Sequence, residues 1–256
     1  MGPHVSAVEY AISDRIGRIT LNRPEHLNAI TVELAGQLEH ALTELSREPA
    51  VNVIVIRGAG QNFCAGGDVG EVERLTSVGP DRLRTLFDAF RRACDAIAGV
   101  DVPVIAAVEG VAMAGGFELM QAADIVIVSD DAKIADNHIN FGMVPGGGST
   151  QRLPRLVGRQ LALGLLLSGD RFSGLDAVRL GLAYRSFAPQ DFDEGVDQLV
   201  AQLAGRDRAA VTTIKRLVAG ARQRSLPEGL DEEINAVVAH ITRRGVDEFN
   251  RVGSSS

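Results

Sequence analysis

The sequence contains little cysteine and no long apolar run. Its two cysteines, Cys64 and Cys94, stand in no CxxC motif and in no Cys/His cluster. Such usage is typical of a reduced cytosolic protein, so we expect a cytoplasmic protein without a metal site. No stretch of 18 apolar residues occurs, and the N-terminus lacks the basic-then-apolar pattern of a signal peptide. We therefore expect no membrane-spanning segment.

Positive charge is also in short supply. The 256 residues include 26 Lys and Arg against 33 Asp and Glu, which gives a formal net charge of −7 at pH 7. This balance argues against nucleic acid or an anionic membrane as the main partner. Apolar residues make up 45% and charged residues 23% of the chain. That composition excludes the disordered and coiled-coil classes and predicts a globular protein with a full core.

The common glycine-based binding and catalytic motifs are missing as well. The chain has no GxGxxG, no GxxxxGK and no GxSxG motif. A dinucleotide site, a P-loop and an α/β-hydrolase nucleophile are therefore not supported. Cys64 has no histidine near it in the sequence, and we interpret it as a small buried residue rather than a nucleophile.

Strand and helix patterns alternate up to about residue 158. Strands are predicted at 8–13, 16–22, 51–58, 102–110, 124–129 and 132–135, and helices at 31–48, 82–100 and within 111–124. Thr31 is the expected N-cap of the first helix. This order predicts an α/β fold with a parallel sheet covered by helices. From residue 159 onward the pattern is almost wholly helical, and we divide the chain into a core, 1–190, and a C-terminal helical region, 191–256.

Two strand-to-helix turns share one pattern of small residues. The first ends in Ala65-Gly66-Gly67-Asp68 and the second in Ala114-Gly115-Gly116. Adjacent parallel strands deliver their C-terminal loops to the same edge of a sheet, where two backbone N–H groups can converge on one carbonyl oxygen. Either sequence alone would be a tight turn with a structural role. The pair, with the carboxylate of Glu118 one turn into the second helix, favours an oxyanion hole.

Five ordered motifs extend over nearly the whole chain. They are ITLNRPEHLNAI (19–30), NFCAGGDV (62–69), VAMAGGFELMQAADIVIVS (111–129), FGMVPGGGSTQRLPRLVG (141–158) and FSGLDAVRLGLAYRSF (172–187). They resemble the crotonase superfamily, also called the enoyl-CoA hydratase/isomerase family. The resemblance implies a crotonase-like α/β fold, in which ββα repeats form a spiral core and the C-terminal helices form trimers. It also implies an enzyme acting on an acyl-CoA thioester, with no cofactor beyond the CoA of the substrate, and a homotrimer or a dimer of trimers.

The resemblance assigns roles to individual residues. By position, Gly67 and Gly115 are the N–H donors to the thioester oxygen, and Glu118 is a catalytic glutamate that activates water. His138 stands where hydratases of the family carry a second glutamate, and a histidine can do acid/base work near neutral pH. The substrate-binding candidates are His26, Leu27, Cys64, Ala65 and Phe249 for the CoA moiety, together with Asp68 and with Asp136, which could orient His138 or stand in for it.

These assignments leave alternatives open. Glu118 could be a glutamate favoured only by the helix dipole, and His138 could be a polar residue of a pocket wall. Asp68 also fits a turn carboxylate that accepts backbone N–H groups. The favoured function is a hydratase-type lyase with His138 at a non-standard second catalytic position. Isomerisation, decarboxylation, hydrolysis of a C–C or thioester bond, and acyl-CoA binding without turnover are the alternatives.

Overall fold

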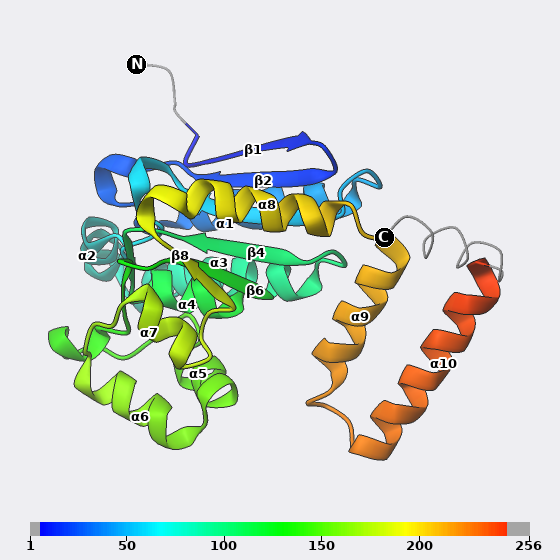
Figure 1. The fold of residues 1–256 in the computed structure, drawn as a ribbon. Helices are drawn as coiled ribbons and strands as arrows, with labels where there is room; N and C mark the ends of the chain where they lie inside the picture. The colour runs from blue at the N-terminus through cyan, green and yellow to red at the C-terminus, as the bar shows by residue number, and fades with distance from the viewer. Residues whose placement is uncertain (1–5, 245–256) are drawn as a thin grey trace.

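The structure is a computed structural model that describes residues 6–244, and a six-stranded sheet runs through its centre (Figure 1). The sheet has the order β1-β2-β3-β4-β6-β8. Its strands are β1 (Val8–Ser13), β2 (Ile16–Leu21), β3 (Val53–Gly58), β4 (Val104–Val108), β6 (Ile125–Ser129) and β8 (Arg185–Phe187). β1 pairs antiparallel with β2, and the other neighbouring pairs are parallel. β1 and β2 thus form a hairpin, and the predicted α/β class is confirmed.

Helices follow most of the strands. The α-helices are α1 (Val32–Arg47), α2 (Val69–Val78), α3 (Pro80–Gly99), α4 (Gly115–Ala122), α5 (Ser149–Val157), α6 (Arg159–Ser168), α7 (Gly174–Arg179), α8 (Phe192–Ala204), α9 (Arg208–Gly220) and α10 (Leu226–Arg244). The short 3₁₀ helices are η1 (Pro24–His26), η2 (Ala59–Gln61), η3 (His138–Phe141) and η4 (Pro189–Asp191). α1 begins as predicted, because the Thr31 hydroxyl accepts a hydrogen bond from the N–H of Leu34 at 3.0 Å. Within residues 6–244, no helix is long and apolar enough to cross a membrane.

Both faces of the main sheet are covered, which explains why the sequences of its central strands are continuous runs of β-branched residues. In β3, Ile54 and Ile56 join a core cluster with residues of α1 and α3, whereas Val53 and Val55 join a second cluster with residues of α8. All four side chains are fully buried. Figure 1 shows α8 lying over the sheet. A strand covered on both faces has no reason to alternate apolar and polar residues.

A second, smaller sheet leads into the candidate site. β5 (Val111–Met113) and β7 (Lys133–Ala135) pair in parallel and stand apart from the six-stranded sheet. β5 runs directly into α4, so the predicted helix within 111–124 begins only at Gly115. The residues before it are extended because they pair with β7. This short sheet places the start of α4 beside the loop that follows β3.

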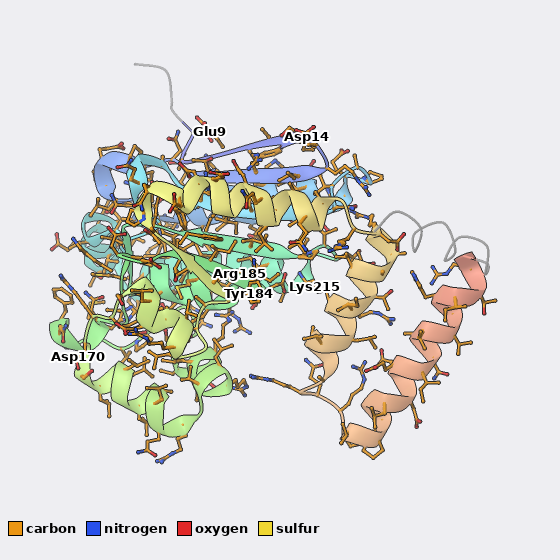
Figure 2. All side chains as sticks on the ribbon, in the orientation of Figure 1. Glu9, Asp14, Asp170, Tyr184, Arg185 and Lys215 are labelled. Atoms are coloured by element: carbon orange, nitrogen blue, oxygen red, sulfur yellow. The ribbon has the colours of Figure 1, made fainter. Side chains whose placement is uncertain are left out.

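The last two helices stand beside the core rather than over it (Figure 1). Lys215 of α9 faces the core (Figure 2), where its Nζ lies 2.7 Å from a carboxylate oxygen of Asp124 and donates to the carbonyls of Ile97 and Val102. This buried ammonium group anchors α9. α10 presents an exposed apolar stripe, made of Leu226, Leu230, Ile234, Val237, Val238 and Ile241.

Two elements differ from the sequence prediction. α2 occupies 69–78, where no helix was predicted. β8 lies within the stretch after residue 159 that was predicted as almost wholly helical, at 185–187 where no strand was predicted. Three residues are too few for a periodic signal, and β8 forms only because it pairs with the distant β6. The division at residue 190 stays a prediction, although α8 from the proposed C-terminal region packs on the core sheet.

Candidate active site

The two glycine turns lie side by side because the first one extends the small sheet. The N–H of Cys64 donates to the carbonyl of Val111 at 2.9 Å, and the N–H of Met113 donates to the carbonyl of Cys64 at 3.0 Å. Cys64 therefore forms a parallel bridge with Ala112 of β5. The chain on either side of this bridge continues into the two turns. The structure brings the two turns together, as their shared pattern predicts.

Glycine is required where the two turns touch. A Cβ atom at Gly116 would lie 2.0 Å from the carbonyl oxygen of Cys64, and one at Gly66 would lie 2.9 Å from the Cβ of Ala114. Gly66 also has a φ of 107°, which a residue with a side chain rarely adopts. The close approach of two backbones thus explains these glycines.

Gly67 and Gly115, the two predicted oxyanion donors, lie at the same cavity. Both residues line that cavity, and within residues 6–244 neither N–H group has a hydrogen-bond acceptor. Gly115 is the first residue of α4, whose N-terminal N–H groups lack intrahelical partners. Ala114 before it has φ 48° and ψ −116°, a strained conformation for an L-residue. An unpaired N–H group at the start of a helix, with a second unpaired N–H group in the same cavity lining, is an arrangement that can bind a negatively charged oxygen.

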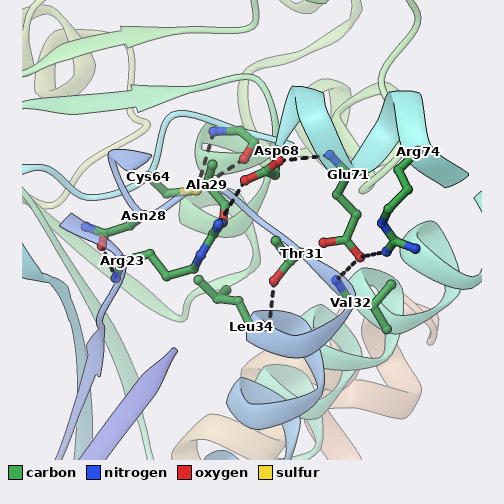
Figure 3. Close-up of polar contacts among 11 residues, drawn as sticks. Arg23, Asn28, Ala29, Thr31, Val32, Leu34, Cys64, Asp68, Glu71 and Arg74 are labelled. Carbon is green, nitrogen blue, oxygen red and sulfur yellow. Dashed lines mark hydrogen bonds and ion pairs between the residues drawn. The ribbon is translucent and has the colours of Figure 1, made fainter. Parts of the chain in front are cut away.

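A polar network holds the first turn in place (Figure 3). The guanidinium of Arg23 donates to the carbonyl of Ala29 and lies 2.9 Å from a carboxylate oxygen of Asp68. The other oxygen of Asp68 accepts the N–H of Glu71 at 2.9 Å and caps α2. Burial acts to raise the pKa of Asp68, but the Glu71 N–H and the Arg23 charge outweigh it, and the pKa is lowered. Both oxygens of this predicted substrate-binding residue have protein partners.

Glu118 lies inside the protein, one turn into α4. Its side chain is 2% exposed, and its Oε1 accepts the N–H groups of Gly147 and Ser149 at 2.8 and 3.0 Å. Burial raises the pKa of Glu118 above its ordinary value, and the two N–H groups and the nearby His138 counteract only part of this. Both of these N–H groups bind Oε1, so that Oε2 is the oxygen without a backbone hydrogen bond. This environment is that of a held and desolvated carboxylate.

His138 lies between two carboxylates. Its Nδ1 is 2.7 Å from Oδ1 of Asp136, and its Nε2 is 4.0 Å from Oε2 of Glu118. Burial acts to lower the pKa of His138, but the hydrogen bond to Asp136 and the charges of Asp136 and Glu118 outweigh it, so that the pKa is raised. Asp136 is 1% exposed and, of the described residues, is not one that lines the cavity. The structure thus places this predicted substrate-binding residue behind His138.

The cavity of about 340 Å³ that contains these groups is mostly apolar. Its apolar walls are formed by Ile30, Val69, Val72, Leu86, Phe87, Phe90, Phe141 and Met143, and its polar side chains are Glu73, Glu118, Asn137 and His138. α2, α3 and η3 supply most of the walls. An apolar pocket with a few convergent polar groups is the usual form of a small-molecule site.

The predicted CoA contacts lie along the first turn, with one exception. Ala65 lines the cavity, and its N–H donates to the carbonyl of Leu27 at 3.0 Å. Leu27 is exposed, and His26 ends η1 immediately before it. Cys64 is fully buried, and burial raises the pKa of its thiol to about 12, so the thiol is protonated at neutral pH. Phe249 lies outside the described residues.

Sequence reasoning missed the support of Glu118. A Cβ atom at Gly147 would lie 2.1 Å from the ring of Phe90 and 2.8 Å from Glu118 Oε2, so glycine is needed there. Arg152 donates to the carbonyl of Gly147, while the N–H of the same residue donates to Glu118. The run Gly146-Gly147-Gly148 was the available signal for this close approach. Nothing in the sequence pairs it with Glu118, which is about thirty residues earlier.

The chain is similar to known enoyl-CoA hydratases and isomerases in both sequence and structure. The family model for enoyl-CoA hydratase/isomerase matches residues 11–250. The chain is 35% identical over 223 residues to the peroxisomal Delta(3,5)-Delta(2,4)-dienoyl-CoA isomerase of Arabidopsis thaliana, covering 83% of this chain and 80% of the relative. It is 34% identical over 228 residues to the mitochondrial enoyl-CoA hydratase of Pongo abelii, covering 86% of this chain and 77% of the relative. A solved structure from Thermobifida fusca YX in complex with CoA matches with a TM-score of 0.83 and 30% identity, covering 93% of this chain and 94% of that chain.

Proposed function

The chain belongs to the enoyl-CoA hydratase/isomerase family, and on this premise we propose that it adds water across the α,β double bond of an acyl-CoA thioester. Gly67 and Gly115 hold the thioester oxygen, Glu118 takes the proton from water, and His138 supplies the proton to the α-carbon. The family includes several reactions on one fold, so the reaction has to be argued from the site itself.

One observation carries the proposal: a carboxylate and an imidazole face each other across 4.0 Å in the cavity that both glycine turns line. A water molecule near Oε2 of Glu118 lies within reach of a base, and a substrate carbon next to Nε2 of His138 lies within reach of an acid. Hydration needs both groups at once, because one proton leaves water and another is added to the α-carbon.

The two N–H groups stabilise the charge that develops between these proton transfers. When hydroxide from the water adds to the β-carbon, the electron pair of the double bond moves toward the thioester oxygen and gives an enolate. The N–H groups of Gly67 and Gly115 donate to that oxygen, and the N-terminal end of α4 favours its negative charge. Preorganised donors of this kind strengthen their bonds as the charge grows.

The proton balance closes within the site. Glu118 becomes protonated when water adds, and His138 becomes neutral when the enolate takes its proton at the α-carbon. The proton on Glu118 then passes to His138 across the 4.0 Å gap, and the starting charges return. Net uptake of a proton from solvent is not required.

The remaining parts of the substrate follow the shape of the cavity. The apolar walls suit a hydrocarbon acyl chain. We place the CoA moiety along His26, Leu27, Cys64 and Ala65, with Asp68 at the same turn and Phe249 as a further contact. A relative from Thermobifida fusca YX that holds CoA supports a CoA thioester as the ligand.

We place the protein in the cytoplasm, and the exposed stripe of α10 supports its assembly as a homotrimer or a dimer of trimers. Six exposed apolar residues on one helix form a surface suited to burial against another chain. Light scattering at micromolar concentration should report three or six chains. A monomer at that concentration would contradict the assembly without affecting the assigned reaction.

Isomerisation is the second candidate, because one of the relatives is a dienoyl-CoA isomerase. The same acid and base could move a proton between two carbons without adding water.

Mass spectrometry of the protein incubated with 2-enoyl-, 3-enoyl-, dienoyl-, oxoacyl- and malonyl-type CoA thioesters distinguishes the reactions. Gain of one water from a 2-enoyl-CoA supports hydration, whereas loss of carbon dioxide or release of free CoA indicates a decarboxylase or a thioester hydrolase. An unchanged mass with a new absorbance indicates isomerisation, and binding without any product indicates a protein without turnover.

A further inference from the structure

We propose that Asp136 is a positioning residue, which orients the imidazole of His138 and keeps it charged as the proton donor of the site. The donor role rests on the proposed function, whereas the orientation and charge of the ring do not. Asp136 acts through His138, since it is not among the described residues that line the cavity.

The contact with Asp136 sets the orientation of the imidazole ring. Asp136 precedes η3, and its Oδ1 is 2.7 Å from Nδ1 of His138. A carboxylate only accepts hydrogen bonds when ionised, so this contact requires a hydrogen on Nδ1. The other ring nitrogen, Nε2, then faces Oε2 of Glu118 at 4.0 Å. The contact with Asp136 therefore fixes which nitrogen of His138 faces the site.

Asp136 places a carboxylate in a buried position. This carboxylate is 1% exposed, and its Oδ2 is buried without a hydrogen-bond partner among the described residues. A buried carboxylate with one hydrogen bond is costly unless a positive charge lies beside it. Among the described residues, the ion pair of Asp136 is with His138, whose Nδ1 lies 2.7 Å from Oδ1. His138 is thus the group that can supply the compensating charge.

Titratable groups face the ring of His138 from more than one element. The titratable groups that face His138 are Asp136 on its own segment and Glu118 of α4, while Glu73 of α2 lines the same cavity. Two carboxylates flank one imidazole, and both favour its protonated form. The raised pKa of His138 agrees with this arrangement. A histidine in this environment is protonated at the start of the reaction and can act as the proton donor, while Glu118 acts as the proton acceptor.

The test is a titration of the histidine side chains by nitrogen-15 NMR in the full-length protein. The chain has five histidines, and the resonances absent from a His138→Gln variant identify His138. In Asp136→Asn the amide oxygen can still accept Nδ1–H, but the negative charge is gone. We expect the titration midpoint of His138 to move to lower pH in this variant.

Asp124→Asn is the matched control. Asp124 is another aspartate with a cationic partner, Lys215, but it is more exposed than Asp136 and belongs to the contact between α9 and the core. Its replacement should lower stability and leave the titration of His138 where it is. A structural role of Asp136 would likewise lower stability without moving that midpoint.

Kinetics give the second readout, on whichever thioester the protein turns over. Loss of the charge at Asp136 should lower kcat by roughly tenfold or more with little change in KM. It should also move the fall of kcat at high pH toward lower pH, because the donor loses its proton earlier. Asp136→Ala, which removes the hydrogen bond as well, should cost more than Asp136→Asn.

A midpoint for His138 that is the same in the parent and in folded Asp136→Asn would overturn the proposal. If the variant fails to fold, the parent protein alone tests the orientation of the ring. The nitrogen-15 shifts of the neutral His138 ring show which of its two nitrogens carries the hydrogen. We expect Nδ1–H, and a neutral ring protonated at Nε2 would overturn the orientation. If the midpoint moves as expected but the parent turns over no thioester, the proposed function fails and the role of Asp136 stands.

Discussion

The cavity has two chemically different sides. On one side are Gly67 and Gly115, the proposed backbone N–H donors, which have no titratable side chain. On the other side, Glu118 and His138 offer side chains whose charges depend on pH and on each other. The first side is set by the close approach of two chain segments, and the second is set by hydrogen bonds made by buried side chains.

The difference determines how each side can be altered. A backbone donor cannot be removed by shortening a side chain, so the donor side responds only to proline or to a steric clash. The acid/base side responds to the exchange of a single atom, as in Glu→Gln, and to a change of pH. Variants of the two sides should therefore differ in their pH dependence even where their rates fall by similar factors.

The largest expected effect is that of Glu118→Gln. The variant keeps the shape and can still accept the N–H groups of Gly147 and Ser149, but it removes the base. We expect kcat to fall by about 10²–10⁴ while acyl-CoA binding is retained. Steady-state kinetics and calorimetric binding of a thioester measure the two effects separately.

Glu109→Gln is the control for that experiment. Glu109 is half-buried beyond the end of β4, burial raises its pKa as well, and it lies outside the cavity lining. Its loss should leave turnover unchanged. Equal rates for Glu118→Gln and the parent would remove Glu118 from the mechanism and leave the donor side as the main source of catalysis.

The next effect is that of Gly67→Pro on the donor side. Proline removes one N–H group, and we expect turnover to fall by about 10²–10³ with the shape of the pH profile retained. Gly67→Ala keeps the N–H group, and its Cβ meets nothing closer than Val72 Cγ2 at 3.9 Å, so it should lose less. Circular dichroism checks the fold of both variants. Turnover that survives in a folded Gly67→Pro protein argues against the oxyanion assignment.

The two sides also differ in how far the sequence could predict them. The donor side was visible, because two Ala-Gly-Gly turns after two predicted strands imply adjacent loops. Glu118 was found as a candidate from the motif that contains it, and His138 from its position four residues before Gly142, where the resemblance implies a second glutamate. The contacts that support them were not, since the N–H groups of Gly147 and Ser149 meet Glu118 only after distant segments pack.

The same distinction holds for the fold. α1 was predictable because a cap residue and a helical stripe are local, and the structure confirms Thr31 as its N-cap. β8 was not predictable, because three residues carry no periodicity and depend on β6 for their hydrogen bonds. Asp136 and His138 are close in the sequence, but the strength of their interaction depends on the burial of Asp136, which no local sequence pattern predicts.

A smaller effect is expected where the two turns touch. Gly116→Ala places a methyl group 2.0 Å from the carbonyl of Cys64, so the turns must separate. We expect the free energy of unfolding to fall by about 1–3 kcal/mol, measured by urea denaturation. Gly164→Ala in α6 is the control, because its Cβ meets nothing within 4 Å and should be neutral or stabilising. A Gly116→Ala protein as stable as this control would show that the turns can move apart without cost.

The smallest effect is the pH dependence of stability that the acid/base side contributes. The pKa of Glu118 is raised in the folded state, so its ionisation opposes folding. The stability that it contributes is complete below the ordinary pKa of a glutamate and is lost as the pH rises through the folded value. The Tm of Glu118→Gln relative to the parent should therefore increase by about a few degrees between pH 4.5 and pH 8.

The pKa of His138 is also raised in the folded state, so its contribution to stability is likewise lost as the pH rises. This loss occurs at higher pH than for Glu118, beginning near the ordinary pKa of a histidine. Thermal scans of His138→Gln should accordingly show their relative gain at higher pH than those of Glu118→Gln. A difference in Tm that stays constant with pH for both variants would mean that neither group has a different pKa in the folded and unfolded states, and the contrast between the two sides would then be one of position alone.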